Sequence, residues 1–187
     1  TSALEFETLT LLGSCCAINN WEDVADLDRL CDELGLDTIE TGAAIAVLMD
    51  AGGMEWGDAV GAKKLLSEGV CSGDKDAVDV ANGAVAVGSA RNHARVPVAK
   101  GQAMPAWDPR PLLAAGITYC SSAMGADHTA GLVVDPAISG EAAAIASQEV
   151  QIINALCDTS GFCMFLGPTI DEHRKFYSIM FNEELSN

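Results

Sequence analysis

Residues 30–37 read LCDELGLD, and residues 156–163 repeat nearly the same pattern as LCDTSGFC. Each copy closes a stretch with the apolar spacing of an amphipathic helix, and its glycine stands where that helix would end. Each copy then finishes on a side chain that can bind a ligand, Asp37 in the first and Cys163 in the second. The repetition predicts two similar chemical groups held by two helix ends, with a metal-binding thiolate added in the second.

The composition favours closely packed helices. The 187 residues are 49% hydrophobic but only 5% aromatic, and they include 18 glycines. A chain of this length can bury a core in one large or two small domains. We therefore predict an all-α fold.

Local signals place the helices along the chain. Apolar spacing and end signals predict helices over 20–34, 38–50, 57–68, 75–93 and 139–156. Asn20 can cap the first, and Thr169 with Glu172 has the spacing of a capping box for a last helix. Only residues 131–134 indicate a strand.

Prolines interrupt the helical pattern in the middle of the chain. They are Pro97, Pro105, Pro109 and Pro111. Because proline cannot continue a helix interior, this stretch is predicted to be irregular. We place a boundary near residue 96, which gives helical subdomains over 1–96 and 97–187.

Charge and cysteine usage limit the partners and the compartment. The formal net charge is −17 at pH 7, which argues against nucleic acid as a partner. No run of about 18 apolar residues occurs, and no basic segment followed by an apolar one opens the sequence, so we expect neither a membrane span nor a secretory signal. Seven cysteines without a C-x-x-C pair indicate reduced thiols in a cytoplasmic protein.

One segment departs from the acidic character of the chain. Arg91, Arg95, Lys100 and Arg110 lie within twenty positions, together with His93. Two interpretations stay open, an ordinary solvated segment or a local contact with an anion.

The chemistry of the repeated pattern follows from its spacing. Glycine at a helix end adopts the left-handed conformation and reverses the chain, so Asp32 and Asp37 can point at one small object. A carboxylate accepts hydrogen bonds in a two-pronged fork, which fits a guanidine-like edge such as the 2-aminopyrimidinone of guanine or a pterin. The alternative is that both are surface acids around a helix stop.

Cys163 stands in the second copy where the first has Asp37. A lone cysteine can be an ordinary core residue, or it can be a thiolate favoured beside the exposed N–H groups of a helix end. One cysteine cannot hold an iron–sulfur cluster, so any partner cysteines must lie outside this chain.

The paired patterns resemble those of the tungsten-containing aldehyde:ferredoxin oxidoreductase family. Further segments share the resemblance, in the family's order: 5–8 (EFET), 35–42 (GLDTIETG), 100–110 (KGQAMPAWDPR) and 125–128 (GADH). The match runs from Glu5 to near Phe165 and is similar to the helical second and third domains of that family.

The resemblance implies a mononuclear tungsten held by the dithiolenes of two pterins (tungstopterin, a molybdopterin-type cofactor), with a [4Fe-4S] cluster nearby. On the family pattern, Asp32, Leu36 and Asp37 contact one pterin. Asp158 and Phe162 contact the other.

The resemblance also implies the residues around the metal. Cys163 matches the fourth ligand of the cluster. Glu7 and His128 match the family's acid and base, with Glu7 preferred over Glu5 for its spacing to the first aspartate pattern. A carboxylate and a neutral imidazole can exchange protons near neutral pH.

Two departures from the family pattern stand out. The family's first domain, a β-structure that carries a C-x-x-C-x-x-x-C group, has no counterpart here, and no E-x-x-H pair supports a mono-iron site. We therefore expect a fragment, or one piece of a split enzyme, that is inactive without the N-terminal domain.

Three functions remain open from the sequence. The first is a segment of an oxidoreductase that oxidises aldehydes to carboxylic acids and passes electrons to ferredoxin, with a homo-oligomer possible. The second is a tungsten enzyme of the same superfamily acting on another carbonyl or an aromatic acyl thioester. The third is a non-catalytic helical domain whose acidic surface binds a partner protein.

Overall fold

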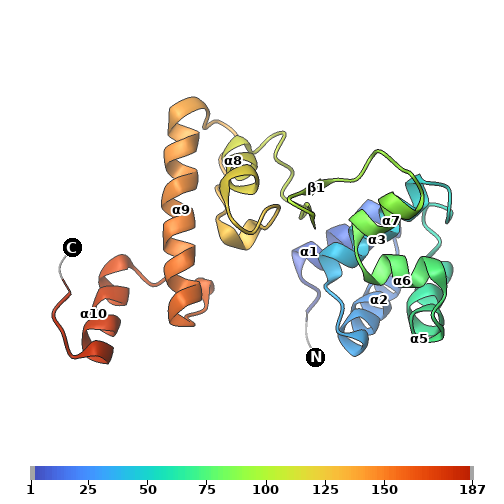
Figure 1. Cartoon of the computed structure of the whole chain (residues 1–187), viewed down its shortest axis with the longest axis horizontal. Coiled ribbons are helices and arrows are strands. Elements are labelled where there is room, and N and C mark those ends of the chain that lie inside the picture. Colours follow the sequence, from blue (N-terminus) through green and yellow to red (C-terminus); the bar gives the residue numbers. More distant parts are fainter. Residues whose placement is uncertain (1–2, 186–187) are drawn as a thin grey trace. The chain divides into compact units, whose positions relative to one another are not determined.

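The computed structural model describes residues 3–185, and helices make up almost all of the regular secondary structure among them (Figure 1). The only sheet among these residues is a hairpin of β1 (Val98–Ala99) and β2 (Gln102–Ala103). The predicted all-α fold is therefore confirmed. Within the described residues, no helix combines the length and the apolar character needed to cross a membrane.

The chain packs as two compact units. Unit 1 comprises Thr1–Asp108 with Met124–Asp127, and unit 2 comprises Pro109–Ala123 with His128–Asn187. The boundary predicted near residue 96, between helical subdomains over 1–96 and 97–187, stays a prediction.

Unit 1 is built around α3 (Thr38–Asp50), in which the nine residues Thr41–Met49 are buried. A helix buried on all sides matches the apolar run predicted for it. Gly42 sits where α3 meets the N-terminal segment, and a Cβ there would lie 2.5 Å from the backbone carbon of Leu11. Only glycine lets these two elements pack so closely.

Other helices surround α3. A short α1 (Phe6–Thr8) continues into a π-helical turn over Leu9–Gly13, and α2 (Trp21–Leu34) follows, capped by Asn20. The next elements are α4 (Ala59–Lys64), α5 (Val70–Ser72), α6 (Lys75–Ala81) and α7 (Ala84–Ala90). The α2 and α3 bounds confirm the helices predicted over 20–34 and 38–50.

Unit 2 has fewer buried side chains. It holds α8 (Leu113–Ser121), a 3-10 helix over His128–Ala130, the long α9 (Gly140–Ser160), a 3-10 helix over Met164–Leu166, and α10 (Ile170–Phe181). The predicted capping box is confirmed, because the side chains of Thr169 and Glu172 each bond the other's backbone N–H. In α9 only Ala143, Ser147 and Cys157 are buried.

Two local predictions are wrong. The helix predicted over 75–93 is divided at Gly83, whose φ of 94° is not helical. The Glu40 carboxylate lies where a Cβ of residue 83 would be and accepts from the N–H of Ala84, the first residue of α7, at 2.8 Å. The strand predicted over 131–134 is irregular chain, and at Gly131 that chain runs against Val150 of α9 instead of a second strand.

Candidate functional site

The first repeated pattern reverses the chain between α2 and α3. Gly35 ends α2 in the left-handed conformation (φ 70°, ψ 35°), and its N–H donates to the carbonyl of Asp32 at 3.3 Å. Asp32 is exposed in the last turn of α2, whereas Cys31, the residue before it, is fully buried. Cys31 thus packs this helix end into the core, and the Asp32 carboxylate faces solvent.

Asp37 has a structural task that the ligand hypothesis did not include. Its Oδ2 accepts from the backbone N–H of Glu40 at 2.7 Å, which caps α3. The carboxylate is exposed and, with two oxygens, keeps acceptor capacity for a ligand. Sequence reasoning could have found this cap, because Asp37 directly precedes a predicted helix.

Asp32 lines a groove of about 560 Å³ in unit 1. The lining residues are Leu4, Leu9, Trp21, Ala25, Asp28, Arg29 and Asp32. Leu36 and Asp37 do not line it. Asp28, which sequence reasoning missed, stands one helical turn before Asp32 on the same face of α2.

The second pattern repeats the same helix end. Gly161 ends α9 in the left-handed conformation (φ 74°, ψ 10°), and its N–H donates to the Asp158 carbonyl at 3.3 Å. Cys157 is buried and Asp158 is exposed, as in the first copy. Cys163 is exposed at the start of the 3-10 helix, and its side chain caps no N–H.

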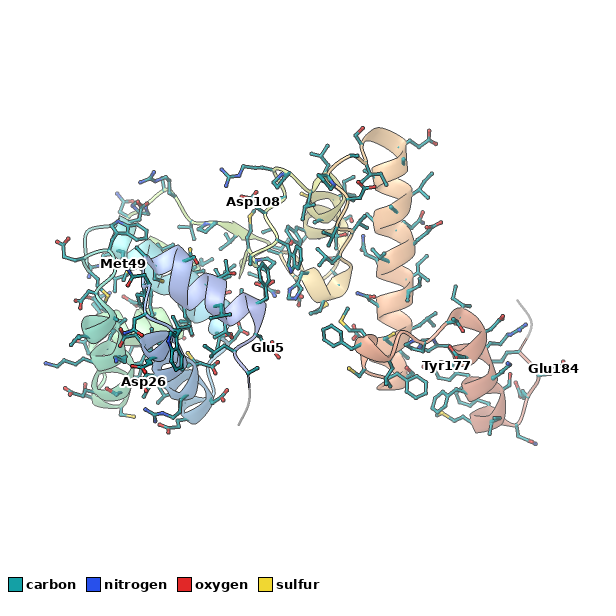
Figure 2. The ribbon with its side chains drawn as sticks, turned by 180° about the vertical axis from the view of Figure 1, so that it is seen from behind. Glu5, Asp26, Met49, Asp108, Tyr177 and Glu184 are labelled. Carbon is teal, nitrogen blue, oxygen red and sulfur yellow. The ribbon has the colours of Figure 1, made fainter. Side chains whose placement is uncertain are left out.

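The residue after each glycine packs inward. Leu36 packs against the core of unit 1. Phe162 meets two rings of α10, Phe176 at a centroid distance of 4.8 Å and His173 at 5.7 Å. The aromatic row continues along α10 to Tyr177, labelled in Figure 2. Helix α10 therefore supports the second turn, a role that the capping box at Thr169 could have suggested.

Glu7 is buried, with 7% of its surface exposed. Its Oε2 accepts from the backbone N–H of Ala106 at 2.7 Å, so it anchors the 100–110 segment. Glu40 acts in the same way, accepting from Ala103 and Ala84, each at 2.8 Å. Two carboxylates thus fix this segment to the helices of unit 1.

His128 begins the 3-10 helix of unit 2 and is half-buried. Asn154 of α9 donates to the carbonyl of the next residue, Thr129, at 2.8 Å, which holds that helix in place. Glu7 belongs to unit 1, and its pairing with His128 stays a prediction. The same holds for the approach of the two repeated turns to a common site.

Three side chains of the basic segment over 91–110 are bonded to carboxylates of unit 1. Arg95 and His93 both bond the Asp50 carboxylate at 2.6 Å, and Arg91 pairs with Asp76. Arg91 and Arg95 are therefore ion-paired within unit 1, and His93 is hydrogen-bonded to the same carboxylate as Arg95. The anion contact that the sequence left open has no support from these three side chains.

The cysteines divide into buried and exposed groups. Burial raises the pKa of Cys31 to about 11, and burial together with the charge of Cys15 raises that of Cys16 further. Both thiols stay protonated at neutral pH and are poor ligands. Across residues 3–185 no three His, Cys, Asp or Glu side chains group in a way that could hold a metal ion.

Comparisons with known proteins identify the family. The family model described as "Aldehyde ferredoxin oxidoreductase, domains 2 & 3" matches residues 1–187. The chain is 26% identical, over 93% of its length, to the tungsten-containing aldehyde ferredoxin oxidoreductases of Pyrococcus furiosus and Thermococcus kodakarensis. It spans 33% of the length of each relative. The chain therefore belongs to the aldehyde ferredoxin oxidoreductase family, in the part that carries its second and third domains.

Proposed function

We propose that this chain is the helical part of a tungsten–pterin oxidoreductase that oxidises aldehydes to carboxylic acids and passes the electrons through a [4Fe-4S] cluster to ferredoxin. The observation that carries the proposal is the repeated helix end. Gly35 and Gly161 adopt the same conformation, and each leaves an aspartate exposed and a cysteine buried in the turn before it. Two equivalent turns suit a cofactor with two equivalent pterins.

The residues of the first turn fit a pterin. Asp32 and Asp37 are exposed acceptors, and the 2-aminopyrimidinone edge of a pterin presents the matching N–H donors. In the second turn, Asp158 would take the same part. Leu36 and Phe162 hold the two turns against their own units and would limit how far the carboxylates move.

Cys163 fits a single cluster ligand. It is exposed, and no side-chain hydrogen bond of the cap would have to break before it binds iron. The other three thiolates would come from outside residues 1–187, in the N-terminal domain that the family carries.

When bound, the tungsten–pterin group supplies the two-electron redox chemistry. The overall change converts an aldehyde and water to a carboxylic acid, two electrons and two protons. Glu7 and His128 would take up these protons and release them to water.

The test uses the complete enzyme purified without air. Cys163→Ser should lower iron content and electron transfer to ferredoxin with a smaller effect on tungsten, because a hydroxyl is a poor iron ligand. Asp158→Ala should lower pterin and tungsten first. Cys120→Ser, an exposed cysteine of α8 outside the pattern, is the control and should change neither.

Three results would contradict the proposal. One is a complete enzyme without tungsten or pterin, which would favour the interaction-domain alternative. Another is oxidation of a different carbonyl, or action on an acyl thioester, without turnover of aldehydes. The third is iron–sulfur absorption in residues 1–187 alone that disappears in Cys163→Ser, because that cluster would draw all its ligands from this chain.

A further inference from the structure

The two repeated turns treat one equivalent position in opposite ways. In the first turn, Ile39 stands two residues after Asp37 and packs against the core of unit 1. In the second turn, the equivalent residue is Phe165, two positions after Cys163, and 93% of its surface is exposed. The same turn therefore buries an apolar side chain in one copy and leaves a larger one in solvent in the other.

The neighbours of Phe165 extend this exposed surface. Leu166 is 75% exposed and Met164 38%, so all three residues of the 3-10 helix over 164–166 are apolar and open to solvent. A 3-10 helix has three residues per turn, so these side chains point in three directions. A fully apolar surface helix is typical of a site that another part of a protein covers.

The 164–166 helix is held in place from within unit 2. The N–H of Leu166 donates to the carbonyl of Cys163 at 3.0 Å, which closes the helical turn. On the inner side, Phe162 packs against the rings of α10. The outward side chains therefore stand on an anchored turn whose inner face already has its partners.

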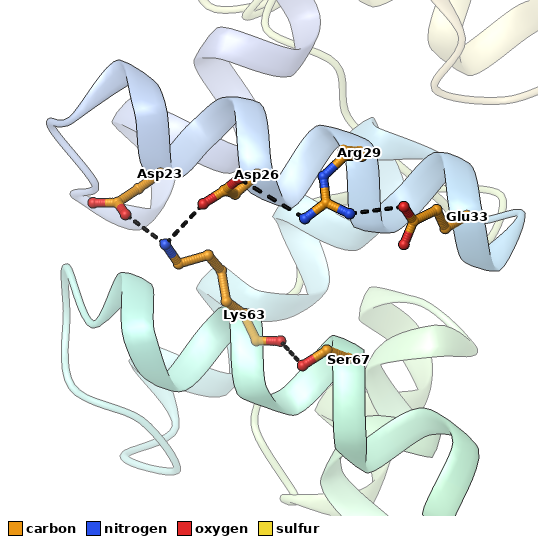
Figure 3. Close-up of polar contacts among 6 residues, drawn as sticks. All are labelled: Asp23, Asp26, Arg29, Glu33, Lys63 and Ser67. Atoms are coloured by element: carbon orange, nitrogen blue, oxygen red, sulfur yellow. Dashed lines mark hydrogen bonds and ion pairs between the residues drawn. The ribbon is translucent and has the colours of Figure 1, made fainter.

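Unit 1 pairs the side chains around its own first turn. On α2, which leads into that turn, Asp23 and Asp26 bond Lys63 of α4 at 2.7 and 3.1 Å (Figure 3). Ile39, on the other side of the turn, has its apolar cover. Among residues 3–185 nothing gives Phe165 a comparable cover. The second turn is thus the one that leaves room for a partner.

Resting on the cluster role proposed above for Cys163, we propose that the 164–166 helix is a packing surface for the part of the enzyme that supplies the other three cluster thiolates. Cys163 and Phe165 are two residues apart, so their Cα atoms lie within about 7 Å of each other. A chain whose thiolates bind the same cluster comes equally close to Cys163 and can cover Phe165 and Leu166 with apolar side chains. A ferredoxin or a second copy shares no ligand with Cys163 and has no such reason to lie there.

The test places the photoreactive residue p-benzoylphenylalanine at position 165 of the complete enzyme. This residue keeps the phenyl ring and, when irradiated, bonds to a neighbouring C–H group. Peptide mass spectrometry should find position 165 joined, within one polypeptide, to a segment next to the cysteines that bind the cluster. Position 179 is the matched control, because Ile179 is 82% exposed on α10 outside the 164–166 helix. It should not form that crosslink.

Iron content provides a second measurement. Phe165→Asp in the complete enzyme should lower iron at least about twofold, because a charge in a covered apolar contact weakens the packing that brings the thiolates together. Phe165→Leu should retain the iron. Ile179→Asp makes the same kind of change on α10 and should also retain it. Circular dichroism checks that each variant keeps its helices.

The outcomes separate this inference from the proposed function. Crosslinks from position 165 to residues 1–108, to a second copy or to added ferredoxin overturn the inference, as does the absence of any crosslink. The proposed function stands in each of these cases if Cys163→Ser lowers the iron content. If Cys163→Ser leaves the iron content unchanged, the cluster role of Cys163 and the inference both fail.

Discussion

The two repeated turns begin alike and end differently. Both stop a helix at a left-handed glycine and bury the cysteine before the exposed aspartate. The first then enters the buried helix α3, where Asp37 caps the backbone. The second enters three residues of 3-10 helix, where Cys163 caps nothing. One turn is thus part of a core, whereas the other leaves its last side chain free for a ligand.

The largest expected difference in stability is between the residues that stand three positions after the end of each pattern, Glu40 and Leu166. Glu40→Ala should lower the free energy of unfolding by more than about 2 kcal/mol, because it leaves the N–H groups of Ala84 and Ala103 without an acceptor at about 1–3 kcal/mol each. Leu166 holds the equivalent position in the second turn and is 75% exposed. Leu166→Ala should change stability by less than about 0.5 kcal/mol.

Urea unfolding of both variants checks this prediction. Equal losses at the two positions would mean that the second turn is as firmly built into its unit as the first. A small loss for Glu40→Ala would mean that the 100–110 segment is held mainly by other contacts.

The next effect is at the last position of each pattern. Asp37→Ala should cost about 0.5–2 kcal/mol through loss of the α3 cap, whereas Cys163→Ala should stay within about 0.5 kcal/mol. Asp37→Asn should restore the stability, since asparagine caps as well as aspartate does. In the complete enzyme that variant should still lose pterin, which separates the cap from the ligand role. Full retention of pterin would restrict Asp37 to capping.

The cysteines allow the two turns to be compared by reactivity. Cys163 should react with iodoacetamide at least about tenfold faster than Cys31 or Cys157, because buried thiols react only when the helix end opens. Peptide mass spectrometry after timed labelling gives the three rates. Fast labelling of Cys157 alone would show that the second helix end opens and that its resemblance to the first is only partial.

Much of the fold was predictable because its signals are local. Asn20, Gly35 and the Thr169 capping box each act within a few residues, and the helices that they bound were predicted correctly. The break at Gly83 was not predicted, because the carboxylate that packs against it and bonds the next N–H belongs to Glu40, 43 positions away in the chain. Long-range packing of this kind leaves no periodic trace in the sequence.

The local geometry of the two repeated turns was predictable to a similar extent, whereas their part in one site stays a prediction. Asp32 and Asp158 could be singled out from the repeat, and their common helix-end geometry is confirmed. The hydrogen bond from the Ala106 N–H to Glu7 could not be predicted, because it joins residues that are 99 positions apart in the chain. Asp28 carried a weaker signal, the one-turn spacing to Asp32. Its neighbours Leu4 and Leu9 come from a segment for which no element was predicted.

The smallest expected effect is that of Asp28 on the free energy of unfolding, which its charged carboxylate lowers. Its pKa is raised above the ordinary 3.8, first by burial and then by Asp32 and Glu5, so the folded state binds this proton more tightly than the unfolded state. Stability therefore falls as pH rises from 3.8 through the raised value, and at neutral pH the charged form is the less favourable one.

Asp28→Asn should accordingly raise the free energy of unfolding at pH 7 by up to about 0.5 kcal/mol, and the gain should vanish below the ordinary pKa. Asp26→Asn, which loses its ion pair with Lys63, should lower it by a similar amount. Thermal unfolding at pH 7 and at pH values below 3.8 measures both. A destabilised Asp28→Asn would mean that the charged carboxylate stabilises the fold.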